Sequence, residues 1–462
     1  GLPIPAFFGP EPGQYLLTRA SVAAVPDKVR EHGSDVWFKA PPEDLLADYD
    51  VNSDPDAPEW MTQGQEDLSP PALSELAKAH DIFDVWFESG SSWNAALKRM
   101  QGDYPADLYL EVSDQHRGWF QLSLLPAIGV TGRSPFKNVL THGFMVDRHG
   151  HKMSKSLGNA LDVDELLKDF GADVCRWWVS SLNTDNDIKV DLDYFKHAGD
   201  EYRKVRNTLR FILSNLGDFN ASADKVKLND DEATSIDAWA TGELIKLSDT
   251  VRGAYERFEF RRAHEALFNF CNDTMSAVYL AAVKDRLYCD KADSRRRRRT
   301  QTTLYRIAST LIRLLAPIMP HTADEAWSAL EGDGAKCVHL LEFQDVDCMR
   351  QIPVDERWSQ VMEHRDVWMR TLEQFRQSHD VDNPLDLGLR VGVALDGFAP
   401  EDLADLCAIS QFSTAGSESS VEVIDLRSEP RCERSWKRDG TVKQRSDGGS
   451  LCDRCAEAVG VA

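Results

Sequence analysis

The sequence lacks any apolar run long enough to cross a bilayer. A spanning helix needs roughly 20 consecutive apolar residues, and the 462 residues contain no such stretch. The chain also lacks an N-terminal segment of the kind that directs secretion. We therefore expect a cytoplasmic protein with no membrane partner. Because the first residue is Gly1 rather than Met, we expect the natural chain to begin further upstream.

Paired cysteine spacing is absent until the very end of the chain. The nine cysteines are an odd number in a long sequence, which indicates reduced thiols rather than a disulfide framework. Positive charge is scarce, since 53 Lys and Arg face 76 Asp and Glu and the net charge is −23. Such a balance repels nucleic acid in general, but RNA binding depends on local basic faces. Charge alone therefore leaves nucleic-acid binding undecided.

The length predicts several domains, and residues 107–142 indicate an α/β sheet. Runs at 107–111 and 138–142 are typical of buried parallel strands, with a helix between them over 119–130. In such sheets, ligands bind beyond the carboxyl ends of the strands. Residues 1–75, rich in Pro, Gly and Asp, predict irregular connections with a few short elements.

The rest of the chain is predicted to be mainly helical. Residues 160–215 have helical periodicity with a polar loop at 183–193, and residues 230–330 have the pattern of long amphipathic helices. Pro317 and Pro320 are expected to end one of these helices. Residues 379–426 mix short strands and helices, and the tail from Arg427 is polar and rich in Gly.

A polar loop at 150–159 carries two lysines, Lys152 and Lys155, between two glycines. A loop of this kind can move, and its ammonium groups can meet the charge that develops as pyrophosphate leaves a triphosphate. The alternative from composition alone is a solvated basic turn.

A strand-to-helix turn places Glu111, Asp114, Gln115 and Trp119 close together, and Trp86 precedes them in the chain. Carboxylates at this point can hold a substrate ammonium group, and indole rings can form an apolar wall for a branched side chain. The alternative is that both tryptophans are ordinary core residues.

These segments resemble class I aminoacyl-tRNA synthetases. Lys152-Met-Ser-Lys-Ser156 matches the KMSKS motif of that family letter for letter, and residues 141–147 resemble the strand and turn that lead into it. Residues 84–93 and 109–120 resemble the isoleucine enzymes more closely than the valine and leucine enzymes. A valine-specific enzyme is disfavoured by the segment around Trp119.

The resemblance implies that ATP and Mg²⁺ convert L-isoleucine into isoleucyl-adenylate, and that isoleucine then passes to tRNA(Ile). It implies a catalytic role for Lys152 and Lys155 on the departing pyrophosphate. The ATP contacts implied are His142, Lys152, Ser154 and Lys155, and the adenylate contacts are Glu111, Asp114, Gln115, Trp119 and Trp86. Val112 stands where the family pattern has glycine, so a turn that needs positive φ would be altered.

The family's HIGH motif is absent from the sequence, and its editing domain would precede residue 1. We therefore expect an incomplete part of a synthetase that is inactive by itself and monomeric when complete. The alternative is a natural short protein, a non-catalytic tRNA-binding module derived from a synthetase.

Arg203, Arg206 and Arg210 share one face of a predicted helix and form a stripe suited to tRNA phosphates. The segment resembles the start of the family's anticodon-binding domain, and the alternative is a solvated face with salt bridges. The five consecutive arginines at 295–299 are predicted to lie in a solvated or disordered linker between helices.

Cys432, Cys452 and Cys455 resemble the terminal zinc site of the bacterial isoleucine enzymes, in which two Cys-x2-Cys pairs bind one ion. Ser435 replaces the second cysteine of the first pair. A structural zinc site takes four ligands, and serine is a poor one. Asp439, Asp447 or water could complete three thiolates, and a metal-free knuckle is the alternative.

The fold class expected is mixed: an α/β Rossmann-like half of a catalytic domain, an all-α bundle and a small α+β tail. Residues 1–146 form the C-terminal half of the catalytic domain, and 147–198 the KMSKS loop and stem-contact region. A helical anticodon-binding domain over 199–345, a junction domain over 346–426 and a zinc-knuckle-like tail over 427–462 follow.

Overall fold

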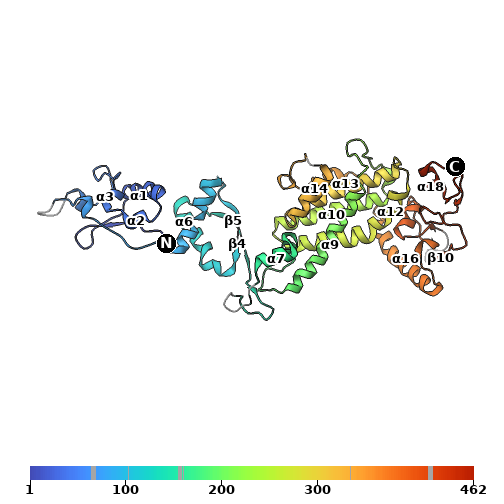
Figure 1. Cartoon of the computed structure of the whole chain (residues 1–462), viewed down its shortest axis with the longest axis horizontal. Helices are drawn as coiled ribbons and strands as arrows, with labels where there is room; N and C mark the ends of the chain where they lie inside the picture. Colours follow the sequence, from blue (N-terminus) through green and yellow to red (C-terminus); the bar gives the residue numbers. More distant parts are fainter. Residues whose placement is uncertain are drawn as a thin grey trace. The chain divides into compact units, whose positions relative to one another are not determined.

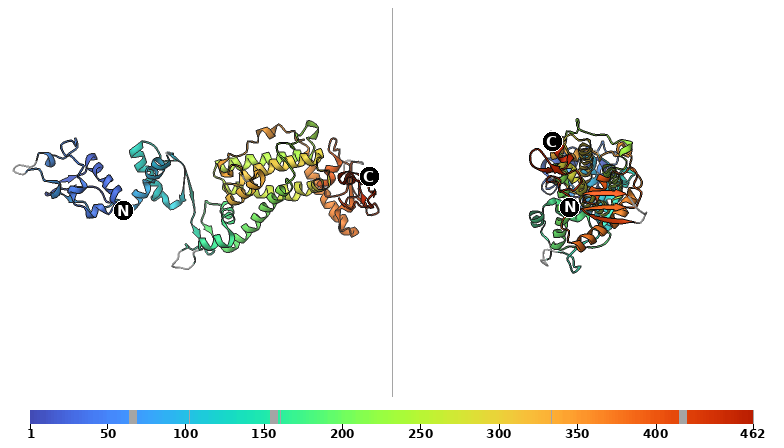
Figure 2. Two further views of the ribbon diagram at one scale, coloured as in Figure 1. Left: turned by 45° about the horizontal axis from the view of Figure 1, so that its top comes forward. Right: turned by 90° about the vertical axis from the view of Figure 1, so that its right-hand side faces the viewer.

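The computed structural model describes residues 1–63, 69–101, 103–153, 159, 161–332, 334–414 and 420–461. The chain divides into two compact units, shown in Figures 1 and 2. One unit comprises Gly1–Phe144 with Thr184–Asn186, and the other comprises Met145–Asn183 with Asp187–Ala462. Among the described residues, no helix has both the length and the apolar character needed to span a membrane.

The first unit opens with a small antiparallel sheet of strand order β2-β1-β3, made by β1 (Phe7–Phe8), β2 (Tyr15–Leu16) and β3 (Ala77–Lys78). Short helices α2 (Val36–Lys39), α3 (Pro42–Leu45) and α4 (Glu59–Thr62) surround it. The buried Trp37 and Phe7 rings lie 5.2 Å apart in its core.

Helix α1 (Arg19–His32) is a full helix in a segment that the sequence predicts to be irregular. The Thr18 side chain caps it by accepting the Ser21 backbone N–H, and Ala24 and Val25 face the core. Pro26 inside the helix removes one backbone donor, which is the pattern that normally ends a helix. Burial of one face against the small sheet outweighs this local preference.

The second part of this unit contains the parallel strand–helix–strand element that the sequence predicts. The strands are not buried as predicted, because most of their residues are exposed or half-buried in this chain. Strands β4 (Ala106–Val112) and β5 (Phe136–His142) pair in parallel, and helix α6 (Trp119–Thr131) connects them. Helix α5 (Val85–Gly90) packs on α6, and a π-helical stretch, Trp93–Gln101, follows it. The register places Glu111 opposite Thr141 and Val112 opposite His142, so both strands end at one edge.

The second unit begins with β6 (Met145–Val146), which pairs in parallel with β7 (Ile188–Lys189). Two helices, α7 (Val163–Phe170) and α8 (Ala172–Ser180), lie between these strands in the sequence. Helix α9 (Leu192–Ser214) then enters a large bundle, as Figure 1 shows. The polar loop expected at 183–193 is found, with β7 and the start of α9 inside its range.

The bundle confirms the long amphipathic helices predicted after residue 230. It contains α10 (Ile236–Glu256), α11 (Phe260–Asn269), α12 (Leu280–Cys289), α13 (Arg295–Leu315) and α14 (Pro320–Glu331), with a π-helical stretch at Phe270–Tyr279. Leu244, Leu267 and Leu311 are fully buried between them. Pro320 is the first residue of α14, where its missing N–H costs nothing.

The run Arg295–Arg299 forms the start of α13 and is not a solvated linker, so that prediction is wrong. Each arginine has an acidic partner from a distant segment. The closest are Arg295 with Glu232 (2.7 Å), Arg296 with Asp405 (2.7 Å), Arg297 with Asp218 (2.6 Å), Arg298 with Asp218 and Asp224 (3.6 Å each), and Arg299 with Asp237 (2.7 Å). A charge run looks solvated in sequence because these partners are remote.

The last part of the second unit is a small mixed domain next to the bundle. Helices α15 (Asp347–Arg350) and α16 (Trp358–His379) precede a sheet of order β10-β8-β9, with α17 (Pro400–Leu406) between two of its strands in sequence. The sheet strands are β8 (Leu387–Val391), β9 (Gln411–Thr414) and β10 (Val421–Asp425), visible in orange in the right-hand view of Figure 2. The tail contains β11 (Lys443–Gln444), β12 (Ser450–Leu451) and α18 (Asp453–Val459).

Candidate functional site

The carboxyl edge of β4 and β5 brings together two of the residues singled out in the sequence. Glu111 is exposed at the end of β4, where its carboxylate accepts the Val112 backbone N–H at 3.2 Å. His142 ends β5, and its Nδ1 lies 2.8 Å from the Gly143 carbonyl oxygen. When Nδ1 carries the proton and donates to that carbonyl, Nε2 is left as an acceptor. This edge is where an α/β sheet binds its ligands.

The wall beside this edge is made by Trp119 and its neighbours. The Trp119 ring stacks on the buried Tyr109 ring, with centroids 4.2 Å apart and an interplanar angle of 3°. Its indole N–H donates to the Ser89 carbonyl at 3.1 Å, which ties α6 to α5. The Gln115 side chain accepts the Trp119 backbone N–H at 3.1 Å and so supports the start of α6.

Trp86 lies on α5 and is 44% exposed. The alternative that both tryptophans are ordinary core residues is therefore wrong for Trp86, while Trp119 is half-buried. Asp114 is exposed and accepts a long 3.4 Å hydrogen bond from the Gln115 amide. The exposed indole of Trp86 on α5 and the exposed carboxylate of Asp114 after β4 are both accessible to a ligand.

Two glycines allow this close arrangement. A Cβ on Gly90 would lie 2.2 Å from the Leu122 carbonyl oxygen, so only glycine lets α5 approach α6 this closely. A Cβ on Gly118 would lie 2.8 Å from the Gln115 side-chain oxygen and 3.4 Å from the Trp86 ring.

Val112 has φ −66° and ψ 152°, an extended conformation that any residue adopts. Valine in place of the family's glycine therefore causes no backbone strain.

The base of the lysine loop is held by one carboxylate. Asp147 accepts the backbone N–H groups of His149 and His151 at 2.9 Å each, and the Asn159 amide at 3.0 Å. These bonds, that of Asn159 first, lower the pKa of Asp147 to about 2. Gly150 turns the chain at φ +87°. Asp147 and Asn159 were not predicted as site residues, although both lie at the ends of the motif.

Lys152 is exposed, and its carbonyl oxygen lies 3.3 Å from the Asn159 amide. Ser154 and Lys155, predicted to contact ATP, lie outside the described residues. The described part of the loop is thus a turn closed by Asp147, with Lys152 on its returning arm opposite Val146.

The three arginines predicted to bind tRNA lie on α9 and differ in their partners. Arg203 pairs with Asp200 one turn earlier, and Arg206 makes two 3.1 Å bonds to the Glu325 carboxylate of α14. Arg210 is exposed and makes no ion pair with any residue that the structure describes. Of the stripe, Arg210 has the charge most available to a phosphate.

The tail cysteines form a candidate metal centre. Cys432, Cys452 and Cys455 are fully buried, and their sulfur atoms all lie within 4.8 Å of one another. The Cys452 backbone N–H donates to the Cys432 sulfur at 3.5 Å. Sulfur atoms of a tetrahedral zinc site are separated by roughly 3.8 Å, from Zn–S bonds of about 2.3 Å. The three residues therefore fit a zinc ion, and Ser435 is turned to the Lys437 backbone instead.

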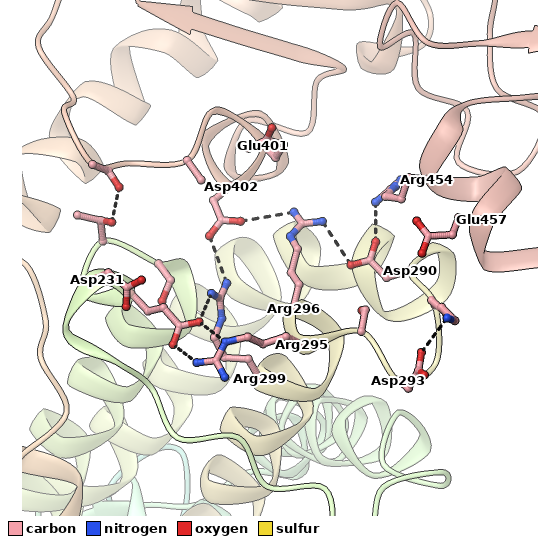
Figure 3. Close-up of a pocket in the computed structure, with 17 residues that line it drawn as sticks. Asp231, Asp290, Asp293, Arg295, Arg296, Arg299, Glu401, Asp402, Arg454 and Glu457 are labelled. Carbon is pink, nitrogen blue, oxygen red and sulfur yellow. Dashed lines mark hydrogen bonds and ion pairs between the residues drawn. The ribbon is translucent and has the colours of Figure 1, made fainter.

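A large polar pocket lies between the start of α13, the α17 region and α18, and Figure 3 shows its charged lining. Arg296 lies between Asp402 (3.4 Å) and Asp290 (3.6 Å), and Arg454 bonds Asp290 at 2.9 Å. Seven acidic and five basic side chains line it, so it carries no excess of positive charge for a phosphate. These ion pairs join the bundle to the C-terminal domain and tail.

Comparison with known proteins matches two family models along the chain. Residues 1–191 match the class I tRNA synthetases for isoleucine, leucine, methionine and valine, and residues 237–391 match the anticodon-binding domain of tRNA ligases. A leucyl-tRNA synthetase of Agrobacterium radiobacter K84, solved in a ternary complex with tRNA and LeuAMS, has a TM-score of 0.51. It shares 20% sequence identity and covers 76% of this chain and 41% of its own, which shows a common fold.

Curated relatives match nearly the whole chain. The isoleucine–tRNA ligases of Moorella thermoacetica and Streptococcus sanguinis are each 37% identical over 99% of this chain. The matched regions are 50% and 49% of those proteins, so the chain spans about half the length of the curated relatives it matches. These matches therefore identify a class I tRNA synthetase domain over residues 1–191 and an anticodon-binding domain of tRNA ligases over residues 237–391.

Proposed function

We propose that the chain supplies the amino-acid pocket, the lysine loop and the tRNA-binding helices of an isoleucine–tRNA ligase. The observation that carries this is the match to isoleucine–tRNA ligases over 99% of the chain at 37% identity. The exposed Trp86, the stacked Trp119 and the exposed Glu111 add side chains of suitable chemistry. Cytoplasmic location and participation in protein synthesis follow from this proposal.

In the proposed reaction, the isoleucine carboxylate attacks the α-phosphate of ATP and pyrophosphate leaves, with Mg²⁺ on the phosphates. Glu111 binds the substrate ammonium group, and Asp114 or Gln115 positions the adenylate. Trp86 and Trp119 border the branched side chain, where apolar contact favours isoleucine. Lys152 and Lys155 stabilise the charge on the departing pyrophosphate, and His142 and Ser154 contact ATP.

In the second step, the 2′-hydroxyl of the terminal adenosine of tRNA(Ile) attacks the adenylate carbonyl and AMP leaves. Arg203, Arg206 and Arg210 on α9 contact tRNA phosphates in this proposal, with Arg210 contributing most because Arg206 is occupied by Glu325. Zinc held by Cys432, Cys452 and Cys455 would fix the tail. The complete enzyme is proposed to act as a monomer.

The chain by itself is proposed to be inactive. Its sequence contains no HIGH motif, and the β4–β5 pair exposes Leu110 (49%) and Val139 (39%), which a doubly wound sheet would cover. We expect no isoleucine-dependent ATP–pyrophosphate exchange from the 462 residues alone. Clear exchange by this chain would contradict the incomplete-site argument.

Two measurements test the function. In the full-length protein of the source cell, exchange should depend on isoleucine far more than on valine or leucine; preference for valine would overturn the substrate. An immunoblot against this chain should show a band of ~100 kDa or more, as added domains of ~100–200 residues each require. A band at 52.0 kDa would instead favour the non-catalytic tRNA-binding module, which none of the comparisons supports.

A further inference from the structure

The tail cluster has three sulfur ligands where a structural zinc ion takes four. Two carboxylates of the tail make hydrogen bonds within it. Oδ1 of Asp439 accepts the backbone N–H and the hydroxyl of Thr441, at 3.0 and 2.9 Å, and Oδ1 of Asp447 accepts the Gly449 N–H at 3.0 Å. Between residues 427 and 462 the sequence contains no histidine and no fourth cysteine. A fourth sulfur or nitrogen ligand therefore has to come from outside the tail.

Cys289, the last residue of α12, lies at the cluster although it is distant in the sequence. It is 6% exposed and belongs to the same small buried group as the three tail cysteines. Its thiol donates to the Arg434 carbonyl oxygen at 3.8 Å, between the tail residues Cys432 and Ser435. A fourth buried sulfur is thus packed into the same cluster as the candidate site.

The tail is anchored to the end of α12 on both sides of Cys289. The Arg434 guanidinium donates to the carbonyl oxygens of Tyr288, at 2.8 Å, and of Cys289. Arg454 bonds the carboxylate of Asp285 at 2.6 Å and that of Asp290 at 2.9 Å. These contacts fix the position of the Cys289 backbone against the tail.

One cation lies beside the cluster. The Arg434 guanidinium is 3.8 Å from the Cys455 sulfur, where it would offset the negative charge of a metal–thiolate centre. The Cys289 sulfur does not lie within 4.8 Å of all three tail sulfurs. Coordination by Cys289 therefore requires a change of its χ1 rotamer, which moves the sulfur by roughly 3 Å.

We propose that Cys289 is the fourth ligand of a zinc site formed with Cys432, Cys452 and Cys455. The ion is then held by four sulfurs, a set that selects a soft tetrahedral metal such as Zn²⁺. Binding releases the thiol protons to solvent. The metal joins the tail to the helical bundle, whereas a second cysteine at position 435 would close the tail on itself.

The test is metal binding by the whole chain, measured with Zn²⁺ and then Co²⁺ added to the reduced, metal-free protein. We expect one ion per chain, and a thiolate-to-cobalt charge-transfer band that corresponds to four Co–S bonds. In Cys289→Ser the band should lose about a quarter of its intensity, and zinc should be lost to a chelator at least tenfold more readily. Cys337→Ser, at an exposed cysteine outside the cluster, should behave as the wild type.

A second variant separates ligand loss from misfolding. Adding Ser435→Cys to Cys289→Ser supplies a fourth thiol from within the tail and should restore the full band. Three Co–S bonds in the wild type with no change in Cys289→Ser would overturn the proposal. So would a reduced protein that binds no metal, or a disulfide between Cys289 and Cys455 in the protein isolated from cells. None of these outcomes depends on synthetase activity.

Discussion

Arg286 on α12 is a fully buried charge whose removal should destabilise the second unit strongly. Its guanidinium lies 2.8 Å from Asp402 and 2.9 Å from Asp405 of α17, and 3.6 Å from Asp237 of α10. All three carboxylates are buried too. The substitution Arg286→Met keeps much of the volume and leaves these carboxylates without their central partner.

Breaking a buried ion pair by removing one partner typically costs 3–5 kcal/mol. In this variant three other cations still face the same carboxylates. Arg296 lies 2.7 Å from Asp405, and Lys437 is in direct contact with Asp405. Arg299 lies 2.7 Å from Asp237. We therefore expect the lower end, about 3 kcal/mol. That is a change of roughly 150-fold in an opening equilibrium.

Hydrogen–deuterium exchange of α10, α12 and α17 at neutral pH is the suitable assay, since a chain of two units need not unfold in a single step. The control is Lys246→Ala, which breaks an exposed 2.8 Å pair with Glu243; such a change should cost less than about 0.5 kcal/mol. Protection in Arg286→Met equal to the wild type would refute the reasoning. It would mean that the other cations suffice to neutralise the buried acids.

The same network predicts an acid transition. Burial raises the pKa of Asp405, but the charges of Lys437 and Arg286 more than offset it and hold the pKa at about 2. A carboxylate with a lowered pKa stabilises the fold above its unfolded value of about 3.9. This contribution is lost as pH falls from about 4 toward 2. In Arg286→Met the loss between these pH values should be shallower, as measured by far-UV circular dichroism.

Three further changes test the sites. Gly90→Ala should destabilise the first unit by about 1–3 kcal/mol because its Cβ would overlap α6. Gly129→Ala inside α6, where a Cβ would meet nothing within 4 Å, should instead leave thermal unfolding unchanged or raise its midpoint, because alanine has the higher helix propensity. Asp147→Asn removes the charged acceptor at the base of the lysine loop. In the full-length protein, kcat should fall with little change in KM for isoleucine. An unchanged kcat would exclude a positioning role for Asp147. Arg210→Ala should weaken tRNA binding and reduce the slope of log affinity against log salt concentration by about 1. Arg206→Ala should have a smaller effect, and equal effects would contradict the inference that Arg210 contributes more than Arg206.

Those elements of the structure that depend on residues close together in the sequence could be predicted from the sequence. The strands at 107–111 and 138–142, the helix between them and the stop before Pro320 depend on neighbouring residues, and the structure has all of them. The lysine motif is contiguous and needs no fold to be recognised. Val112 shows the limit of such matching, because the departure from the pattern causes no backbone strain at φ −66°.

Tertiary structure alone decided which distant groups meet. Arg286 and Asp402 are 116 positions apart, and Cys289 and Arg434 are 145 apart. Periodicity and motifs depend on residues that are close together in the sequence. They therefore predicted a solvated run for the five arginines and gave no prediction for Cys289. Whether a charge is solvated or paired, and whether a thiol is isolated or clustered, depends on chain segments that only packing of the bundle brings together. The sequence by itself therefore determined the local elements and the contiguous motifs, and the fold decided which distant groups they contact.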